Sequence, residues 1–287
     1  MNGLLYKAIS GFYYIWAEEK EYICRGAGKL RLQDSPKVGD IVEFSMEQDK
    51  EVGVITGVHP RKNELVRPSI ANMDLLIIVI SAKPKPDFLL CDKLIIMAKT
   101  ASITPIIFAN KSDMKKAEEL LAPYAEAGLT MLSGSAATGE GMSDLLACMK
   151  GKICCFAGQS GVGKTSLAKQ ILPERNLEVG GISKKTSRGR HTTRHTELLR
   201  LPGGGYIADT PGFSVMGVSD MEPVEIGQMY HEFAAAPPCR FDDCLHIKED
   251  GCMVKPMVEE GKIHRTRYDN YAIIIGEIQE QRRKQYD

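Results

Sequence analysis

The chain has 287 residues, of which 43% are hydrophobic and 26% are charged, and its 37 basic and 37 acidic side chains give a formal net charge of zero. This composition excludes a disordered or fibrous protein, and the length fits one to three domains of about 150 residues each. The balanced charge favours no particular partner, so any affinity for nucleic acid must come from local clusters.

The N-terminal region predicts a small β-barrel. Its first residues, MNGLLYKAISGFYYIW, carry one lysine and no long apolar core, so we expect no signal peptide. Turns rich in glycine then separate short runs in which apolar and polar residues alternate, and no helical period competes with them. Five strands of this length favour an OB-type barrel, with an SH3-like barrel as the alternative. The runs are Leu4–Ile9, Phe12–Ala17, Glu21–Arg25, Ile41–Phe44 and Val52–Val58.

The middle of the chain predicts a doubly wound α/β domain. A polar stretch, residues 59–72, ends the barrel pattern, and from Asp74 strands and helices alternate until the pattern turns helical near Asp220. Leu75–Ile80 and Pro105–Ala109 are almost wholly apolar, as buried parallel strands are, and both are too short to cross a bilayer. The expected helices are residues 87–100, with Asp87 as N-cap, 114–127, 143–149 and 164–172, and the further strands are 129–132, 152–157, 197–201 and 206–208.

A phosphate-binding loop follows the strand that ends at residue 157. Residues 158–166 read GQSGVGKTS and match G-x-x-x-x-G-K-[ST] at Gly158, Gly163, Lys164 and Thr165. The glycines let backbone N–H groups turn toward phosphate oxygens at a helix N-terminus. We expect Lys164 to reach the β- and γ-phosphates and the Thr165 hydroxyl to bind Mg²⁺. The other loop residues assigned to the nucleotide are Gln159, Ser160, Gly161, Val162 and Ser166.

An N-K-x-D motif indicates that the base is guanine. Asn110, Lys111, Ser112 and Asp113 come directly after a predicted strand, where a ligand site in an open α/β sheet belongs. The Asp113 carboxylate can accept hydrogen bonds from the ring N–H and the exocyclic amine of guanine, a pair of donors that adenine lacks. The aliphatic stem of Lys111 can pack on the face of the base.

Two more motifs at strand ends support a GTP site. Ser135 and Ala136 form a pair like the one that contacts the guanine oxygen in Ras-like GTPases, and residues 209–212 read DTPG and match D-x-x-G. We expect Asp209 to hold Mg²⁺ through water and Gly212 to sense the γ-phosphate. The order is circularly permuted, because the base motifs precede the phosphate loop. The same sheet can still form if the original termini are joined and the chain begins and ends elsewhere, since native termini often lie close together.

These motifs and their order resemble the RsgA family, also called YjeQ or YloQ, which are circularly permuted GTPases that depend on the small ribosomal subunit. The resemblance covers essentially the whole chain, including the link ELVRPSIANMD, the stretch GRHTTRH and a Cys/His cluster. It implies an OB-like RNA-binding barrel over residues 1–62, a permuted Ras-like P-loop GTPase domain over 63–219 and a helical zinc-binding domain over 220–287.

The resemblance also implies a function and a location. It indicates a cytoplasmic factor that binds the 30S subunit and its 16S rRNA, assists late maturation of that subunit, and hydrolyses GTP faster when bound to it. We expect a monomer without membrane attachment. A zinc-containing regulatory GTPase that acts on another RNA is the alternative.

The basic stretch Lys184–His195 lies where a switch I loop belongs. It holds five Lys or Arg residues, two His and no acid. We expect a loop that faces rRNA and orders when the γ-phosphate is present, with a solvated basic loop as the alternative. By the resemblance, Thr193 supplies the second hydroxyl near Mg²⁺, and Thr192 is the near alternative.

Phe213 stands where many GTPases carry the glutamine that orients the attacking water. A phenyl ring cannot form that hydrogen bond, so we expect slow intrinsic hydrolysis that rises greatly on the ribosome. Either the partner or His191 would supply the missing polar group. His191 could equally be a structural or RNA-contacting residue.

The C-terminal region contains a predicted zinc site. Cys239, Cys244, His246 and Cys252 lie within a short polar, turn-rich segment. Three thiols and one imidazole suit a single tetrahedral, structural Zn²⁺, and unpaired buried cysteines are the alternative. Such cysteine usage indicates a reducing compartment. The remaining cysteines are expected in cores: Cys24, Cys91, Cys148, Cys154 and Cys155.

The barrel is expected to bind RNA, and two other functions compete with the GTPase assembly factor. Candidate RNA contacts are Tyr13, Tyr14, Trp16, Lys29 and Arg31, although we expect Trp16 and one tyrosine in the barrel core. The first is a small-molecule kinase, but the sequence contains no motif for a second substrate, and N-K-x-D argues against ATP. An RNA-binding protein with a vestigial nucleotide site conflicts with the intact phosphate loop.

Overall fold

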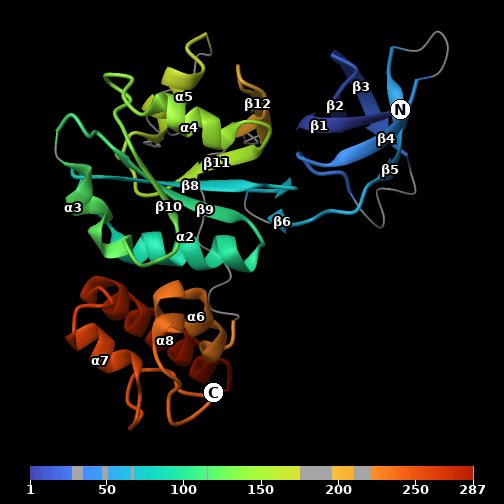
Figure 1. The fold of residues 1–287 in the computed structure, drawn as a ribbon. Coiled ribbons are helices and arrows are strands. Elements are labelled where there is room, and N and C mark those ends of the chain that lie inside the picture. Colours follow the sequence, from blue (N-terminus) through green and yellow to red (C-terminus); the bar gives the residue numbers. More distant parts are fainter. Residues whose placement is uncertain are drawn as a thin grey trace, which may run out of the picture.

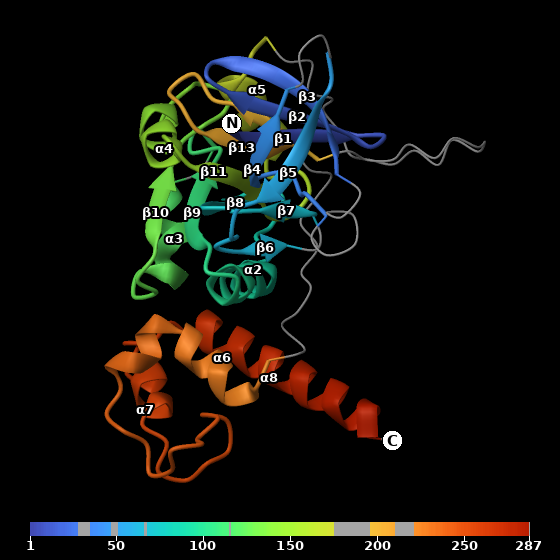
Figure 2. The ribbon, with the colours of Figure 1, turned by 90° about the vertical axis from the view of Figure 1, so that its right-hand side faces the viewer.

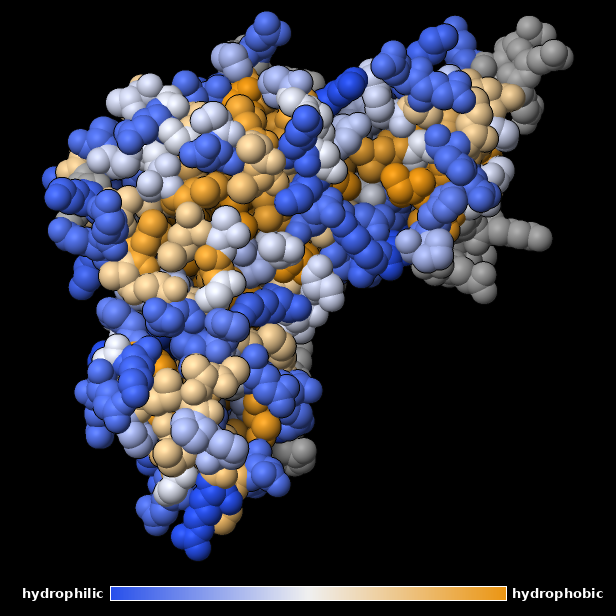
Figure 3. Space-filling model, in the orientation of Figure 1, coloured by the Kyte–Doolittle hydropathy of each residue, from blue (hydrophilic) through white to orange (hydrophobic). Residues whose placement is uncertain are grey.

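The computed structural model describes residues 1–27, 35–46, 51–65, 68–114, 116–174, 196–209 and 221–286. These residues form an N-terminal barrel, a central sheet covered by helices, and a C-terminal helical part (Figure 1). The barrel and the C-terminal part contact different sides of the central part, as the surface in Figure 3 also shows. No helix among the described residues is both long and apolar enough to cross a membrane.

The predicted five-stranded barrel is confirmed. Its strands pair in the order β1–β2–β3–β5–β4, and β4 pairs back onto β1, which closes the barrel. Alternate side chains, among them Leu5, Ile15 and Phe44, fill the interior. The strands are β1 (Asn2–Ile9), β2 (Phe12–Ala17), β3 (Lys20–Gly26), β4 (Ile41–Ser45) and β5 (Gly53–Val58).

The expectation that Trp16 lies in the barrel core is wrong. Ile15 and Ala17 point inward, so the alternation along β2 turns Trp16 outward. The indole is half-buried, and the Arg200 guanidinium lies 5.2 Å from the ring centroid. Tyr13 does pack against the barrel core, as expected for one of the tyrosines. Lys29 and Arg31 lie outside the described residues.

The described residues of the polar stretch after the barrel, 59–65 and 68–72, form regular pairings, which its composition did not predict. The short strands β6 (Glu64–Leu65) and β7 (Ile70–Ala71) pair antiparallel, and Ile70 forms a bridge with Val38. Asn63 also exchanges two hydrogen bonds with the backbone of Met73, at 2.8 and 2.9 Å. These described residues therefore tie the barrel to the start of the central sheet.

The central sheet has the order β10–β9–β8–β11–β13–β12 and is parallel except for β12, which runs antiparallel to β13. Its edge strand β12 also pairs with β1 of the barrel, so one sheet continues from one part into the other. The strands are β8 (Leu75–Ser81), β9 (Thr104–Asn110), β10 (Thr130–Ser133), β11 (Ile153–Ala157), β12 (Glu197–Arg200) and β13 (Tyr206–Asp209).

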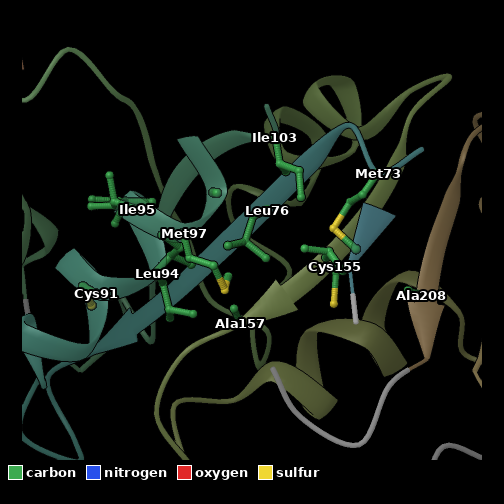
Figure 4. Close-up of a cluster of buried hydrophobic side chains, with 14 of the residues drawn as sticks. Met73, Leu76, Cys91, Leu94, Ile95, Met97, Ile103, Cys155, Ala157 and Ala208 are labelled. Atoms are coloured by element: carbon green, nitrogen blue, oxygen red, sulfur yellow. The ribbon is translucent and has the colours of Figure 1, made fainter. Parts of the chain in front are cut away.

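Helices cover both faces of this sheet, which confirms the doubly wound architecture. Leu76 packs toward α2 (Phe88–Thr100), where Figure 4 shows it near Leu94 and Met97. Its neighbour Leu75 packs on the opposite face, with α4 (Met142–Met149) and α5 (Lys164–Ile171). Successive residues of a strand point to opposite faces, so a wholly apolar strand requires cover on both.

Two predicted helices can be compared closely with the structure. Asp87 caps α2 as expected, because its carboxylate accepts a hydrogen bond of 2.9 Å from the Leu90 amide. The predicted helix 114–127 is wrong in extent. It is replaced by the short helix α3 (Ala117–Leu121) and the 3₁₀ turn η1 (Ala122–Tyr124). Pro123 lacks the N–H that a continuing helix would need.

The C-terminal part packs beneath α2 (Figures 1 and 2). Ile96 of α2 belongs to the C-terminal core, whereas Leu94 belongs to the core under the sheet, so α2 is enclosed on both sides. Four of the five cysteines expected in cores are buried, and Cys148 is only half-buried at a core edge. The elements are α6 (Pro223–Met229), η3 (His231–Ala235), α7 (Val254–Glu259) and α8 (Arg265–Tyr286).

Candidate functional site: a phosphate loop and a cysteine–histidine cluster

The phosphate loop joins β11 to α5 with glycines in conformations that other residues rarely adopt. Gly158 has a φ of +123°, and a Cβ there would lie 2.4 Å from the carbonyl oxygen of Val79. Gly163 has a φ of +102°, and its Cβ would lie 2.3 Å from Nδ2 of Asn110. Glycine is therefore required at both positions, because the loop closes tightly on the ends of β8 and β9.

Lys164 carries its ammonium group inside this loop. Its Nζ donates hydrogen bonds of 2.7 Å to the Gly158 carbonyl and 2.8 Å to the Gln159 carbonyl. Burial lowers the pKa of Lys164 from its ordinary value. A cation held by backbone dipoles in a partly dehydrated loop is suited to an anionic ligand, which would restore the lost solvation.

Asn110 connects three of the predicted motifs. Its Nδ2 donates to the Val162 carbonyl in the phosphate loop at 2.8 Å, and its Oδ1 accepts from the Ala136 amide at 3.1 Å. The side chain is buried, so both hydrogen bonds are shielded from water. The phosphate loop, N-K-x-D and the Ser135–Ala136 pair therefore meet at one edge of the sheet.

Lys111 adds a second link between the base motif and the phosphate loop. Its Nζ donates 2.8 Å to the Gly161 carbonyl and 2.6 Å to the Lys83 carbonyl. The bonds hold the aliphatic stem along the edge where the strands end. Sequence reasoning missed Lys83 and Ser81, whose Oγ also donates to the Lys83 carbonyl at 2.8 Å. Their position directly after an apolar strand is the signal that could have identified them.

The remaining base-motif residues lie in the turns beside Asn110. Ser112 donates from its amide to the Gly134 carbonyl at 3.1 Å and from its hydroxyl to Glu140 at 3.2 Å. Ser135 Oγ accepts from the amides of Ala137 and Thr138, at 3.2 and 3.3 Å. The Asp113 side chain is exposed and therefore open to a ligand.

Two of the oxygen donors predicted for Mg²⁺ follow neighbouring strands of the sheet. Thr165 stands in the first turn of α5, after the phosphate loop that follows β11, and Asp209 ends β13, which pairs with β11. Loss of hydration, followed by the nearby Glu197 carboxylate, raises the pKa of Asp209. A hydroxyl and a carboxylate are hard oxygen donors of the kind that Mg²⁺ takes. His191, Thr193, Gly212 and Phe213 lie outside the described residues.

The cysteine–histidine cluster is confirmed as a group that could hold a metal ion. The ligand atoms of Cys239, Cys244, His246 and Cys252 all lie within 4.8 Å of one another. His246 Nδ1 is 3.5 Å from the sulfur atoms of both Cys239 and Cys252. Burial lowers the pKa of His246, which favours the neutral imidazole that ligates metals. Three soft thiolate donors and one imidazole fit Zn²⁺.

The cluster is tied to the rest of the C-terminal part by tyrosines of α8. Tyr268 donates its hydroxyl to the His246 carbonyl at 2.7 Å, and Tyr271 donates to the Leu245 carbonyl at 2.8 Å. The Met253 amide also donates to the Cys239 sulfur at 3.3 Å. The site is therefore closed by protein on several sides and resembles a structural metal site.

Comparison with known proteins gives one consistent result. The family model described as RsgA GTPase matches residues 58–219, and the model of the RsgA N-terminal domain matches residues 2–55. A protein from Caldanaerobacter subterraneus named small ribosomal subunit biogenesis GTPase RsgA is 42% identical, over 100% of this chain and 98% of its own length. A protein of the same name from a Geobacillus species is also 42% identical, over 98% of both chains.

Solved structures agree with the sequence comparison. The crystal structure of YjeQ from Thermotoga maritima superposes with a TM-score of 0.82 at 34% identity, and the alignment covers 96% of this chain and 98% of that one. The crystal structure of YloQ, described as a circularly permuted GTPase, gives a TM-score of 0.79 at 34% identity, with coverage of 98% and 95%.

Proposed function

The chain belongs to the RsgA family of circularly permuted GTPases, and from this premise we propose that it binds the 30S ribosomal subunit and assists its late maturation. The relatives carry small-subunit biogenesis in their names. The observation that carries the nucleotide part of the proposal is the buried Asn110, which joins the phosphate loop to both base motifs.

We assign the nucleotide contacts by segment. Residues 158–166 hold the phosphates, with Lys164 at the β- and γ-phosphates, and residues 110–113 with Ser135 and Ala136 hold the base. Asp113 supplies the carboxylate that selects guanine. Support comes from the shared sheet edge, which Asn110 joins, and from the Lys164 ammonium held inside the loop.

The chain's own groups bind and position the nucleotide. The Lys164 ammonium and the loop amides stabilise negative charge on the phosphates, and Thr165, Thr193 and Asp209 would hold Mg²⁺. When bound, Mg²⁺ neutralises charge that develops on the phosphate oxygens. Gly212 would sense the γ-phosphate. Phe213 leaves water orientation to His191 or to the ribosome, so hydrolysis by the free chain is slow.

The other parts supply binding and structure. We place the barrel at residues 1–62, the GTPase domain at 63–219 and the zinc domain at 220–287. The barrel contacts 16S rRNA, and one Zn²⁺ per chain stabilises the zinc domain. The protein acts in the cytoplasm as a monomer.

Turnover of GTP with and without purified 30S subunits tests the proposal. We expect the subunit to raise turnover about tenfold or more, and 50S subunits to have no such effect. Lys164→Ala should abolish turnover in both conditions. Equal turnover with and without 30S subunits would reject the ribosomal role, and stimulation only by an unrelated RNA would favour the regulatory alternative.

Base selection is tested separately. Asp113→Asn replaces two acceptor oxygens with an amide, so affinity for GDP should fall by about 10- to 100-fold. Affinity for xanthosine diphosphate should rise, because xanthine carries a carbonyl in place of the amine. Unchanged GDP affinity would remove Asp113 from the base site.

A further inference from the structure

The proposed magnesium ligand Asp209 has a second carboxylate beside it. In the antiparallel pair β12–β13, Glu197 lies directly opposite Asp209. Side chains of directly opposite residues project from the same face of a sheet and interact, and two like charges in this position repel each other. Glu197 is half-buried and Asp209 is exposed, so water and salt screen this repulsion only in part.

Glu197 is in turn paired with a residue of the barrel. Lys7 of β1 is its register partner in the β1–β12 pairing, and Lys7 Nζ lies 3.3 Å from Glu197 Oε2. Lys7 also lies over the ring of Tyr14, 5.6 Å from the centroid, and its side chain is 28% exposed. A row of alternating charge therefore runs across three strands, from Lys7 through Glu197 to Asp209.

We propose that Lys7 and Glu197 are positioning residues that set the Mg²⁺ affinity of the nucleotide site. The Glu197 carboxylate makes the electrostatic potential at Asp209 more negative, which favours a divalent cation, and Lys7 offsets part of this effect. The barrel thereby contributes a charge to the metal site of the GTPase domain. The inference rests on the proposed function, because it assumes that Asp209 serves Mg²⁺.

Shifts of Mg²⁺ affinity in opposite directions distinguish this electrostatic role from general structural support. Glu197→Gln should weaken Mg²⁺ binding, whereas Lys7→Gln should strengthen it, because Lys7 then no longer offsets its part of the Glu197 charge. In the double variant both charges are absent, so the Mg²⁺ affinity should return toward the wild-type value. Loss of structural support would instead shift both single variants in the same direction.

The test uses the full chain loaded with a fluorescent GDP analogue and follows its release at increasing Mg²⁺ concentration. We expect the Mg²⁺ concentration for half-maximal retention to rise about threefold in Glu197→Gln and to fall about threefold in Lys7→Gln, with smaller shifts at high salt. Lys20→Gln, an exposed lysine elsewhere on the barrel, is the matched control and should leave the value unchanged. Circular dichroism confirms that each variant is folded.

The outcomes separate the inference from the proposed function. If release by the wild-type chain does not depend on Mg²⁺, the proposed metal site itself is wrong. If wild-type release depends on Mg²⁺ but both variants match the wild type, or shift in the same direction, the inference about Lys7 and Glu197 is overturned.

Discussion

Arg61 and Arg267 each hold two carboxylates at a boundary of the GTPase domain, but only Arg267 does so out of contact with water. We call the first group, Lys37, Asp40, Arg61 and Glu64, the barrel joint. The second group, Asp92, Glu232, Arg267 and Asn270, is the C-terminal joint. The two joints use the same chemistry, and the difference in hydration decides what each contributes.

The barrel joint is balanced in charge and partly open to water, because only its Asp40 side chain is fully buried. Arg61 forms two hydrogen bonds with Asp40, at 2.7 and 2.8 Å, and a third of 2.5 Å with Glu64. Lys37 adds a second positive charge, because its Nζ lies 2.8 Å from Glu64. The Glu64 side chain is 42% exposed. Hydrogen bonding to Lys37, followed by that to Arg61, lowers the pKa of Glu64 below its ordinary value.

The C-terminal joint is buried and carries an excess of negative charge. Arg267 of α8 pairs with Asp92 of α2 and, at 2.7 Å, with Glu232 of η3, and all three side chains are at most 3% exposed. Arg267 also lies over the rings of Tyr124 and Tyr230. One guanidinium faces two carboxylates here, and burial raises the pKa of Asp92 to about 6 although Arg267 opposes the shift.

The comparison shows that hydration decides how much the loss of one charge in an arginine–carboxylate pair costs in stability. In the barrel joint, water solvates Glu64 and part of Lys37 and Arg61, and the buried Asp40 has a second hydrogen-bond donor in the Lys37 amide, so loss of Arg61 should have a modest cost. In the C-terminal joint each charge depends on its partners, because an uncompensated buried charge is severely destabilising. The C-terminal domain should therefore be held rigidly on α2, whereas the barrel should be the more easily displaced neighbour.

Removal of the metal should have the largest effect on the folded structure, and this effect should be confined to the C-terminal domain. The cluster is hydrogen-bonded to α8 through Tyr268 and Tyr271, so stripping the proposed zinc should unfold residues 221–286 and release Arg267 from α2. Hydrogen exchange before and after treatment with a chelator measures this. Amides of β1–β5 should keep their protection, and loss of protection there would contradict the separation of the two joints.

Arg267→Ala should be the most damaging of the single substitutions at the joints. It leaves Asp92 and Glu232 buried without their cation, at an expected cost of about 3–5 kcal/mol in the free energy of unfolding. Lys93→Ala is the matched control, since Lys93 forms a partly exposed pair with Glu277 between the same helices, and it should cost less than about 1 kcal/mol. Urea unfolding compares them, and equal costs would refute the special role of the buried joint.

Arg61→Ala should cost less than Arg267→Ala, about 1–2 kcal/mol. Asp40 is buried but keeps a hydrogen bond of 2.6 Å from the Lys37 amide, and Glu64 keeps the Lys37 ammonium. The same urea titration provides the measurement. A cost equal to that of Arg267→Ala would show that exposure does not distinguish the joints.

The dependence of stability on pH should differ in sign between the two joints, and it is the smallest of the effects expected here. Because the pKa of Asp92 is raised to about 6, the folded chain binds this proton more tightly than the unfolded chain. Its contribution to stability therefore grows as the pH falls and is lost as the pH rises through about 6. Relative to Asp92→Asn, the wild type should gain about 1 kcal/mol between about pH 8 and about pH 5.5.

The control for that experiment lies in the barrel joint. The pKa of Glu64 is lowered, so its stabilisation is present at neutral pH and is lost only under more acidic conditions. Glu64→Gln should therefore show no gain over the same pH interval. A wild-type profile that runs parallel to that of Asp92→Asn would contradict the pKa shift.

Local patterns were sufficient to predict most of the elements and the meeting of the phosphate loop with the two base motifs. The apolar strands β8 and β9 require helices on both faces of the sheet. Polar motifs that follow parallel strands can meet only at the edge where those strands end. The joints were not predictable, because Asp92 and Arg267 are far apart in sequence and each looks like an ordinary surface charge on a helix. The prediction that Trp16 lies in the barrel core was wrong because the alternation along β2 turns it outward. The predicted helix 114–127 was too long because Pro123 interrupts it.

The enclosure of α2 between the sheet and the C-terminal domain has an evolutionary consequence. A helix packed on both sides has few positions at which a substitution is neutral, so α2 should diverge more slowly among relatives than α4, which buries only one face and carries no residue of the nucleotide site. Asp92, Arg267 and Asn270 share hydrogen bonds, at 2.7 Å between Asn270 Nδ2 and Asp92. These three positions should therefore covary in an alignment, changing together or not at all.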